Sequence, residues 1–320
     1  PDTYFQARRP DLLETSLREI FQDIVNTSNT APAISSSQLR SGELKYVAQF
    51  DPTDGRGEIW AYELLASGMF ATTSTWGAHS ALTSTNWDSG RKIITNNANA
   101  GVALRWGSIG TPKQDVLKAA NGDTYGQAML NWLRGDTSDN SNFRKRPTTS
   151  IMGAIVNSTP TVQQRPGADL RGAEFAGYGA FVNTWRTRKT VLWVGAGDGM
   201  LHAFDAAKTG GGAPLLSYVP EPLFAKLPNW ASPNGDKVQS FVDGSPLTAD
   251  VKVGSNWRTY LFSSMGRGAK GMFALDVTDP ASFTEANAAG IFRWQFTEAD
   301  DASGDLGHIV NDPALSRVSE

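Results

Sequence analysis

The sequence predicts an all-β fold, a β-propeller of irregular four-stranded blades with short helical insertions. Three observations predict it: short apolar runs cut by turn residues, many glycines and prolines, and internal repeats. The 320 residues include 32 glycines and 16 prolines, which are typical of turns between short strands. Four-stranded units repeated along one chain are typical of propeller blades.

Two sequence elements alternate along the chain. The first, a glycine followed by an apolar strand, occurs three times: Gly57–Glu63, Gly199–Asp205 and Gly271–Asp276. The second, a short apolar run with a central proline, also occurs three times: Ile155–Gln164, Phe241–Val251 and Ile309–Val318. This alternation indicates repeated structural units rather than chance similarity.

The repeats predict two complete four-stranded units. The strands of the first are 158–163, 191–197, 200–206 and 215–219. The strands of the second are 245–251, 259–265, 272–277 and 292–296. Residues 43–106 predict a more divergent blade or pair of blades.

The stretch "VLWVGAGDGMLHAFDA" places Gly195, Gly197 and Gly199 after an apolar run, as in a nucleotide-binding loop. Such a loop needs a helix after its third glycine, with its N-terminus facing the phosphates. Residues 200–206 instead alternate with period two, and Asp198-Gly199 is typical of a tight hairpin turn. The stretch therefore predicts two adjacent antiparallel strands.

Helical spacing of apolar residues predicts a terminal helix within residues 1–25, and the polar tract 26–42 predicts a linker. Residues 43–320 then form the propeller domain. A second helical pattern, 113–133, is interrupted at Asn121-Gly122 and predicts a helical insertion.

Composition excludes several functional classes. A net charge of −3 provides no basic field for nucleic acid, and no apolar run is long enough for a transmembrane helix. Because cysteine is absent, thiolate metal sites, cysteine nucleophiles and disulfides are excluded. We expect no catalytic and no cofactor-binding residues.

Two resemblances carry the functional prediction. "LHAFDAAKTG", with Asp205, Thr209 and Gly210, is similar to the propeller repeats of quinoprotein dehydrogenases. The motifs "FRKRPTTSIMGAIVNSTPTV", "VLWVGAGDGMLHAFDA" and "FVDGSPLTADV" occur in the order found in the C-terminal domain of the PilY/PilC family. The chain thus resembles these type IV pilus-tip adhesins and assembly factors, and its first 25 residues resemble the end of a von Willebrand A-like domain.

The PilY/PilC resemblance implies an exported protein at the pilus tip, cell surface or outer membrane of a Gram-negative bacterium. It implies roles in pilus biogenesis, surface attachment, twitching motility and virulence. The implied partners are minor pilins, host cells and abiotic surfaces.

The same resemblance implies calcium regulation through a D-x-D-x-D-G loop, which this sequence lacks. Asp300, Asp301 and Asp305 form the densest acidic cluster and are the candidate metal ligands, since calcium prefers closely spaced oxygen ligands. A solvated acidic loop is the alternative.

The tripeptide Arg134-Gly135-Asp136 is a candidate integrin-type adhesion motif. It also ends a predicted helix, where Gly135 is expected to act as a C-terminal cap. The basic tract Phe143–Pro147 predicts a solvated loop or a docking site for a pilin. The three histidines, His79, His202 and His308, lie far apart in sequence and predict no shared metal site.

Two other functions compete with a pilus role. A quinone-dependent dehydrogenase could use the same propeller superfamily, although many such enzymes carry a pair of adjacent cysteines that this chain lacks. A generic outer-membrane assembly scaffold is the third hypothesis and, like the pilus role, is not enzymatic.

Overall fold

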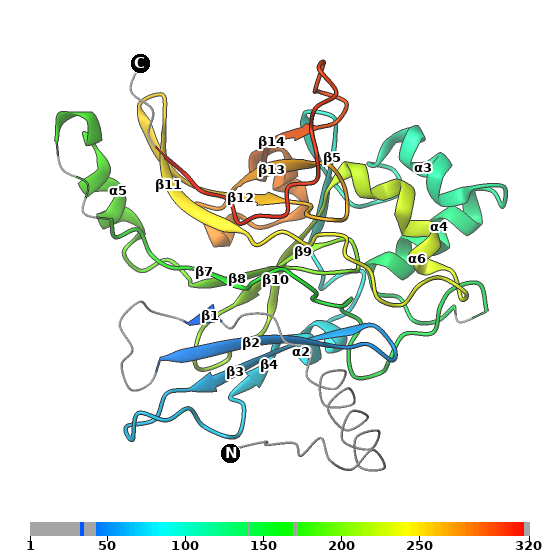
Figure 1. The fold of residues 1–320 in the computed structure, drawn as a ribbon, viewed down its shortest axis with the longest axis horizontal. Helices are drawn as coiled ribbons and strands as arrows, with labels where there is room; N and C mark the ends of the chain where they lie inside the picture. The colour runs from blue at the N-terminus through cyan, green and yellow to red at the C-terminus, as the bar shows by residue number, and fades with distance from the viewer. Residues whose placement is uncertain (1–32, 35–42, 140, 169, 171, 317–320) are drawn as a thin grey trace, which may run out of the picture.

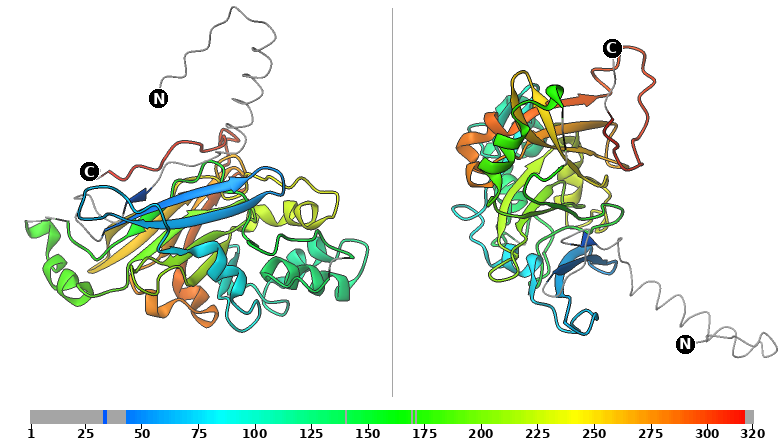
Figure 2. Two further views of the ribbon diagram at one scale, coloured as in Figure 1. Left: turned by 90° about the horizontal axis from the view of Figure 1, so that it is seen from below. Right: turned by 90° about the vertical axis from the view of Figure 1, so that its left-hand side faces the viewer.

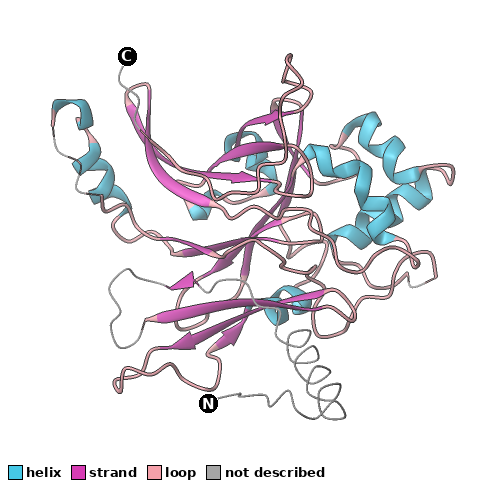
Figure 3. Cartoon of the chain, viewed as in Figure 1, coloured by secondary structure: helices cyan, strands magenta, loops and turns pink. Residues whose placement is uncertain are grey.

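The structure is a computed structural model that describes residues 33–34, 43–139, 141–168, 170 and 172–316. Its strands form three sheets, shown as magenta arrows in Figure 3. The helix expected within residues 1–25 lies outside the described residues.

The first sheet has the order β1-β2-β3-β4. Its strands are β1 (Ala33–Ile34), β2 (Leu44–Asp51), β3 (Arg56–Glu63) and β4 (Trp76–Gly77). β1 lies inside the predicted linker, which therefore contributes a strand, paired antiparallel with β2. The polar composition of this tract hid the strand, although Pro32 precedes it just as Pro160 and Pro246 precede the observed strands at 161–163 and 247–253.

The second sheet has the order β6-β5-β10-β9-β8-β7. Its strands are β5 (Ile93–Asn97), β6 (Ala100–Ala103), β7 (Thr161–Gln163), β8 (Val191–Gly195), β9 (Leu201–Asp205) and β10 (Pro214–Val219). The strands β7 to β10 confirm the first predicted four-stranded unit. β5 and β6 extend it, so the expectation that residues 43–106 form separate blades is wrong for 93–103.

The reason for this extension is the burial of β5. Ile93, Ile94, Thr95 and Asn96 are all buried, which is typical of a central strand covered on both faces. β5 pairs in parallel with β10, far away in sequence, and antiparallel with β6. Alternating hydrophobicity could not predict this pairing.

The third sheet has the order β11-β12-β13-β14 and confirms the second predicted unit. Its strands are β11 (Leu247–Val253), β12 (Asn256–Ser264), β13 (Gly271–Asp276) and β14 (Phe292–Thr297). All neighbouring strands in it are antiparallel.

The glycine-rich stretch is a hairpin, as predicted. β8 and β9 pair antiparallel, with Leu192 opposite Phe204, and Gly199 adopts a positive φ of 85° in the turn. A Cβ atom on Gly195 would lie 2.2 Å from the Val242 carbonyl oxygen, and one on Gly197 would lie 2.2 Å from that of Gln239. These glycines allow the segment 239–242, which precedes β11, to pass closely over the end of β8.

The second and third sheets are joined at equivalent positions of their proline elements. Asn157 Nδ2 donates to Asp243 Oδ2 at 2.6 Å, and the Asn157 backbone N–H donates to Oδ1 of the same carboxylate at 3.1 Å. Ser158 Oγ donates to the Gly244 carbonyl oxygen at 3.1 Å. Each pair is separated by 86 residues, so the repeats meet in register, as successive blades do. The three sheets do not close a ring within the described residues.

Helices and short 3-10 turns fill the connections. The α-helices are α2 (Ala78–Ser84), α3 (Gly110–Lys118), α4 (Asp123–Arg134), α5 (Tyr178–Trp185), α6 (Leu227–Ala231) and α7 (Ala288–Ile291). The 3-10 helices are η1 (Ala173–Phe175), η2 (Glu221–Lys226), η3 (Pro280–Ser282) and η4 (Glu285–Asn287). Figure 2 shows most of the helices along one side of the strands and the last described residues along the other.

The predicted helical pattern at 113–133 forms α3 and α4, with Gly122 at φ 85° between them. These two helices and α6 pack together beside the second sheet (Figure 1). One large core joins this helical group to the second and third sheets, and includes the fully buried Trp132, Trp193 and Trp230.

Candidate functional site

In the acidic cluster, the carboxylates of Asp300 and Asp301 accept hydrogen bonds within local turns. Asp300 Oδ2 accepts hydrogen bonds from the Thr297 backbone N–H at 2.9 Å and from Thr297 Oγ1 at 2.8 Å. Asp301 accepts from Ser303 Oγ at 2.7 Å and from the Leu306 N–H at 2.6 Å, and the Ser303 bond lowers the pKa of Asp301. Asp305 is exposed.

These carboxylates do not fit a calcium site. Asp300 Oδ2 and both carboxylate oxygens of Asp301 accept local hydrogen bonds, whereas calcium needs six to eight oxygens directed at one point. Over the described ranges, no group of three histidine, aspartate or glutamate side chains is placed to hold a metal ion. Calcium binding by this chain stays a prediction.

The tripeptide Arg134-Gly135-Asp136 forms the end of α4. Gly135 has φ 120°, and its N–H donates to the carbonyl oxygens of Asn131 and Trp132, as a C-terminal cap does. The Arg134 side chain is only 1% exposed and forms an ion pair with Glu285 at 2.8 Å. Integrin binding stays untested, and the buried guanidinium argues against it.

The three histidines lie in separate places. His79 is buried against Trp60, with ring centres 4.4 Å apart. His202 is buried in β9, and His308 lies near the turn between β12 and β13, where its Nδ1 is 2.9 Å from the Gly266 carbonyl oxygen. The three side chains therefore lie on separate elements of the fold.

The structure brings together an Asp-His-Ser chain that the sequence did not predict. His202 Nε2 lies 2.9 Å from Asp198 Oδ2, and His202 Nδ1 lies 3.0 Å from Ser217 Oγ. Since an ionised carboxylate only accepts, Nε2 carries the proton and donates to Asp198. All three residues are at most 3% exposed, so no substrate in solvent reaches the serine hydroxyl. The chain of bonds fixes the hairpin turn against β10.

The basic tract Phe143–Pro147 is not the solvated loop that its charge predicts. Phe143 and Arg146 are buried, and the Arg146 guanidinium lies over the ring of Trp132. Aromatic rings on α4 and α6 bury this part of the tract, while Lys145 remains exposed.

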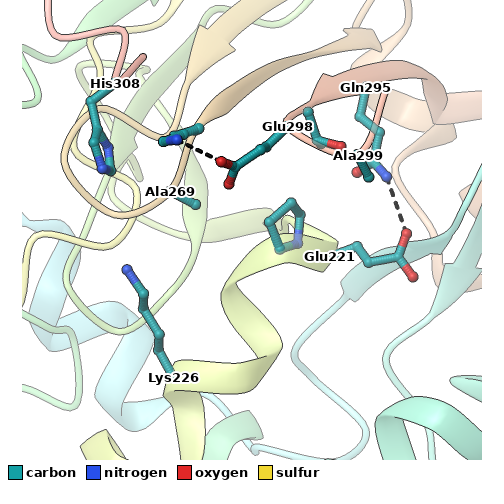
Figure 4. Close-up of a pocket in the computed structure, with 10 residues that line it drawn as sticks. Glu221, Lys226, Ala269, Gln295, Glu298, Ala299 and His308 are labelled. Atoms are coloured by element: carbon teal, nitrogen blue, oxygen red, sulfur yellow. Dashed lines mark hydrogen bonds and ion pairs between the residues drawn. The ribbon is translucent and has the colours of Figure 1, made fainter. Parts of the chain in front are cut away.

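A surface cleft of about 480 Å³ lies between η2 and the third sheet (Figure 4). Its residues come from η2, from the turn between β12 and β13, from the end of β14 and from the last described segment. They are Glu221, Pro222, Lys226, Ala269, Lys270, Gln295, Thr297, Glu298, Ala299 and His308. Figure 4 shows Lys226 and His308 on one side and Glu221 and Gln295 on the other.

Charges of both signs line this cleft. Lys270 forms an ion pair with Glu298 at 2.5 Å, and Gln295 Nε2 donates to Glu221 Oε2 at 3.1 Å. Lys226 Nζ donates to the Gly268 carbonyl oxygen. Two of these contacts lie within the cleft, whereas Lys226 and His308 bond to backbone carbonyl oxygens beside it. Its chemistry suits polar contact with another protein.

The comparisons with known proteins identify the family. Residues 152–320 match the family described as the PilY1 beta-propeller domain. The chain belongs to this PilY1 family. Among curated relatives, a type IV pilus biogenesis factor PilY1 homolog of Xylella fastidiosa is 33% identical over 336 residues, covering 100% of this chain and 25% of the relative.

A type IV pilus biogenesis factor PilY1 of Pseudomonas aeruginosa strain PAK is 31% identical, covering 98% of this chain and 28% of its own length. The chain therefore spans about a quarter of these PilY1 relatives. The crystal structure of the Pseudomonas aeruginosa PilY1 C-terminal domain is 32% identical and covers 48% of this chain and 28% of that chain, with a TM-score of 0.35. None of the helices in the described ranges has the length and apolar composition needed to span a bilayer.

Proposed function

We propose that this chain is the propeller part of a non-enzymatic type IV pilus biogenesis factor that acts through protein–protein contacts at the pilus tip. The observation that carries the proposal is the similarity of nearly the whole chain to factors of that name, at 31–33% identity. The proposal includes export to the cell surface, adhesion and support of twitching motility.

The arrangement of the sheets supports a mechanical role. Hydrogen bonds between Asn157 and Asp243, and between Ser158 and Gly244, tie two sheets together at equivalent positions. Rigid sheets that carry variable loops are suited to present contact surfaces. We infer that the mixed-charge cleft of Figure 4 is one of these surfaces, and that it accepts a polar segment of a minor pilin.

Two observations support a non-enzymatic role. Asp198, His202 and Ser217 are buried from solvent, so the one Asp-His-Ser arrangement described above has no access to substrate. The sequence also lacks the adjacent cysteines that many quinone-dependent dehydrogenases carry. Calcium is left outside the proposal because the described carboxylates do not converge on one point.

Disruption of the gene in the source bacterium tests the pilus role. We expect the twitching zone to fall to that of a strain without the major pilin, and the wild-type gene to restore it. Normal twitching after disruption would contradict the proposal.

A second experiment tests the dehydrogenase hypothesis. The purified chain mixed with pyrroloquinoline quinone and calcium should show no bound-cofactor absorbance and no dye-linked alcohol oxidation. Either signal would favour the dehydrogenase hypothesis instead.

A further inference from the structure

Two arginines that follow α4 lie against indole rings of α4 and α6. The guanidinium carbon of Arg146 is 3.9 Å from the ring centre of Trp132 and 5.1 Å from that of Trp230, and that of Arg144 is 4.8 Å from Trp230. The two indole rings meet edge to face, 4.9 Å apart. We call these four residues the Arg–Trp cluster.

Four polar side-chain nitrogens of the Arg–Trp cluster lack acceptors among the described residues, whereas the Trp132 indole N–H donates to the Arg144 carbonyl oxygen at 3.1 Å. In the part of the chain that the structure describes, seven buried side-chain nitrogen or oxygen atoms have no hydrogen-bond partner, and four of them belong to this cluster. They are Arg144 Nη1, Arg146 Nε, Arg146 Nη1 and Trp230 Nε1. All four are donors. Buried donors in native proteins nearly always have an acceptor, so this concentration indicates an acceptor that the chain itself does not supply.

In the described part of the chain, neither arginine of the cluster has an ion-pair partner of its own: Asp54 lies near Arg144 but pairs with Arg56. Arg146 is only 6% exposed, and burial, reinforced by nearby Arg91 and Arg144, lowers its pKa to about 9. The guanidinium is therefore still protonated at neutral pH. Asp198 is a nearby carboxylate, but it already accepts from the Gly153 and Met200 N–H groups and from His202. Buried charges are normally paired, because an unpaired one is costly.

Stacking explains how the arginines are held without losing their donors. An indole ring contacts the face of a guanidinium, whereas the N–H groups point outward in the guanidinium plane. The rings therefore fix the position of Arg146 and leave its Nε and Nη1 groups buried without a protein acceptor in the described ranges. Water can accept these hydrogen bonds but cannot balance the charge. An oxyanion does both, and pairs with guanidinium edges through two parallel bonds.

We propose that the Arg–Trp cluster is a binding site for a small oxyanion, a phosphate, sulfate or carboxylate group held by Arg144, Arg146 and the Trp230 indole N–H. This inference goes beyond the proposed pilus function and does not depend on it. The anion is either free in solution or the carboxylate of an acidic side chain on a partner.

Thermal unfolding of the purified chain tests this site. Inorganic phosphate, titrated at constant ionic strength maintained with sodium chloride, should raise the unfolding midpoint saturably, by roughly 2 °C. Tryptophan fluorescence should change over the same concentration range, because two indoles belong to the site. A parallel titration with acetate identifies the source: a response to phosphate indicates a free anion, and a response to acetate alone indicates a carboxylate. Either response supports the proposal.

Matched variants test whether the response to the anion arises at the Arg–Trp cluster. Arg146→Met should abolish it, whereas Lys145→Met, which removes the same charge from an exposed neighbour, should retain it. Trp230→Phe keeps the aromatic ring, removes the N–H donor and should weaken binding about tenfold. The Trp230→Phe variant also tests the site if the Arg146→Met variant does not fold. No saturable response to either anion, or an equal response in wild type and in the Arg146 and Trp230 variants, would overturn the proposal.

Discussion

Asp198 is a buried carboxylate whose negative charge is stabilised by hydrogen bonds and by nearby positive charges. It accepts from His202 Nε2 at 2.9 Å, from the Met200 N–H at 3.2 Å and from the Gly153 N–H at 3.3 Å. Burial alone would raise its pKa, but His202, Arg91 and these bonds together hold the pKa below its ordinary value. A lowered carboxyl pKa stabilises the fold above the unfolded-state pKa of about 4, and this stability is lost as pH falls through the folded value.

Replacing Asp198 with asparagine should lower the free energy of unfolding by about 2–3 kcal/mol at pH 7, because a buried charged acceptor is lost. The wild type should lose stability steeply below about pH 4, and the variant should lose less, since it has one fewer carboxylate to protonate. Urea unfolding at pH 3 to 7 measures both effects.

Asp236→Asn is the matched control, because Asp236 is exposed. It should follow the wild-type pH profile. If Asp198→Asn were as sensitive to acid as the wild type, the carboxylate would not have the stabilising role described here.

Contacts between individual side chains were the features hardest to predict from the sequence. The Asp198-Gly199 pair predicts its turn, because turn chemistry is local. The bonds from His202 to Asp198 and Ser217 were missed, because the register of β8, β9 and β10 decides which side chains meet. The burial of Arg146 depends on α4 and α6, which lie on either side of it in sequence.

At the scale of elements, the proline elements of the second and third sheets connect these two sheets. Asn157 and Asp243 form two hydrogen bonds, and Thr161 Oγ1 donates to the Pro246 carbonyl oxygen at 2.5 Å. Asp243 is only 6% exposed, so its carboxylate relies on these partners.

Asn157→Ala should destabilise the chain by about 1–3 kcal/mol, because it removes one of the donors to the buried Asp243 carboxylate. Asp243→Ala should cost a similar amount, because it removes the acceptor of both hydrogen bonds from Asn157. In the double variant the losses should fall short of their sum by about 1–2 kcal/mol, since only one interaction is removed. A double-mutant cycle by urea unfolding measures this coupling. Strictly additive losses would show that the two side chains stabilise the fold independently.

The sequence predicted both complete units because their strands follow one another locally and carry repeated signals. It did not predict β1, which is two residues long and lies in a polar tract, or the addition of β5 and β6 to the second sheet. Parallel pairing between β5 and β10 spans more than a hundred residues and leaves no local pattern.

At the scale of the whole molecule, the chain of three sheets belongs to a PilY1 propeller family, and its second and third sheets meet in register. The three sheets close no ring within the described residues. The cleft of Figure 4 could not be predicted, because its residues come from four segments between Glu221 and His308. The family resemblance, in contrast, was readable from long motifs in a fixed order.

The central claim is that this chain contributes to pilus assembly. Because it spans about a quarter of its relatives, the direct measurement is the number of surface pili, counted by electron microscopy, after in-frame removal of the codons for residues 1–320 alone. Immunoblotting of the truncated protein at normal abundance provides the control. The account predicts a loss of most surface pili, with recovery on expression of the intact gene. A normal number of pili on cells that lack only this chain would contradict it.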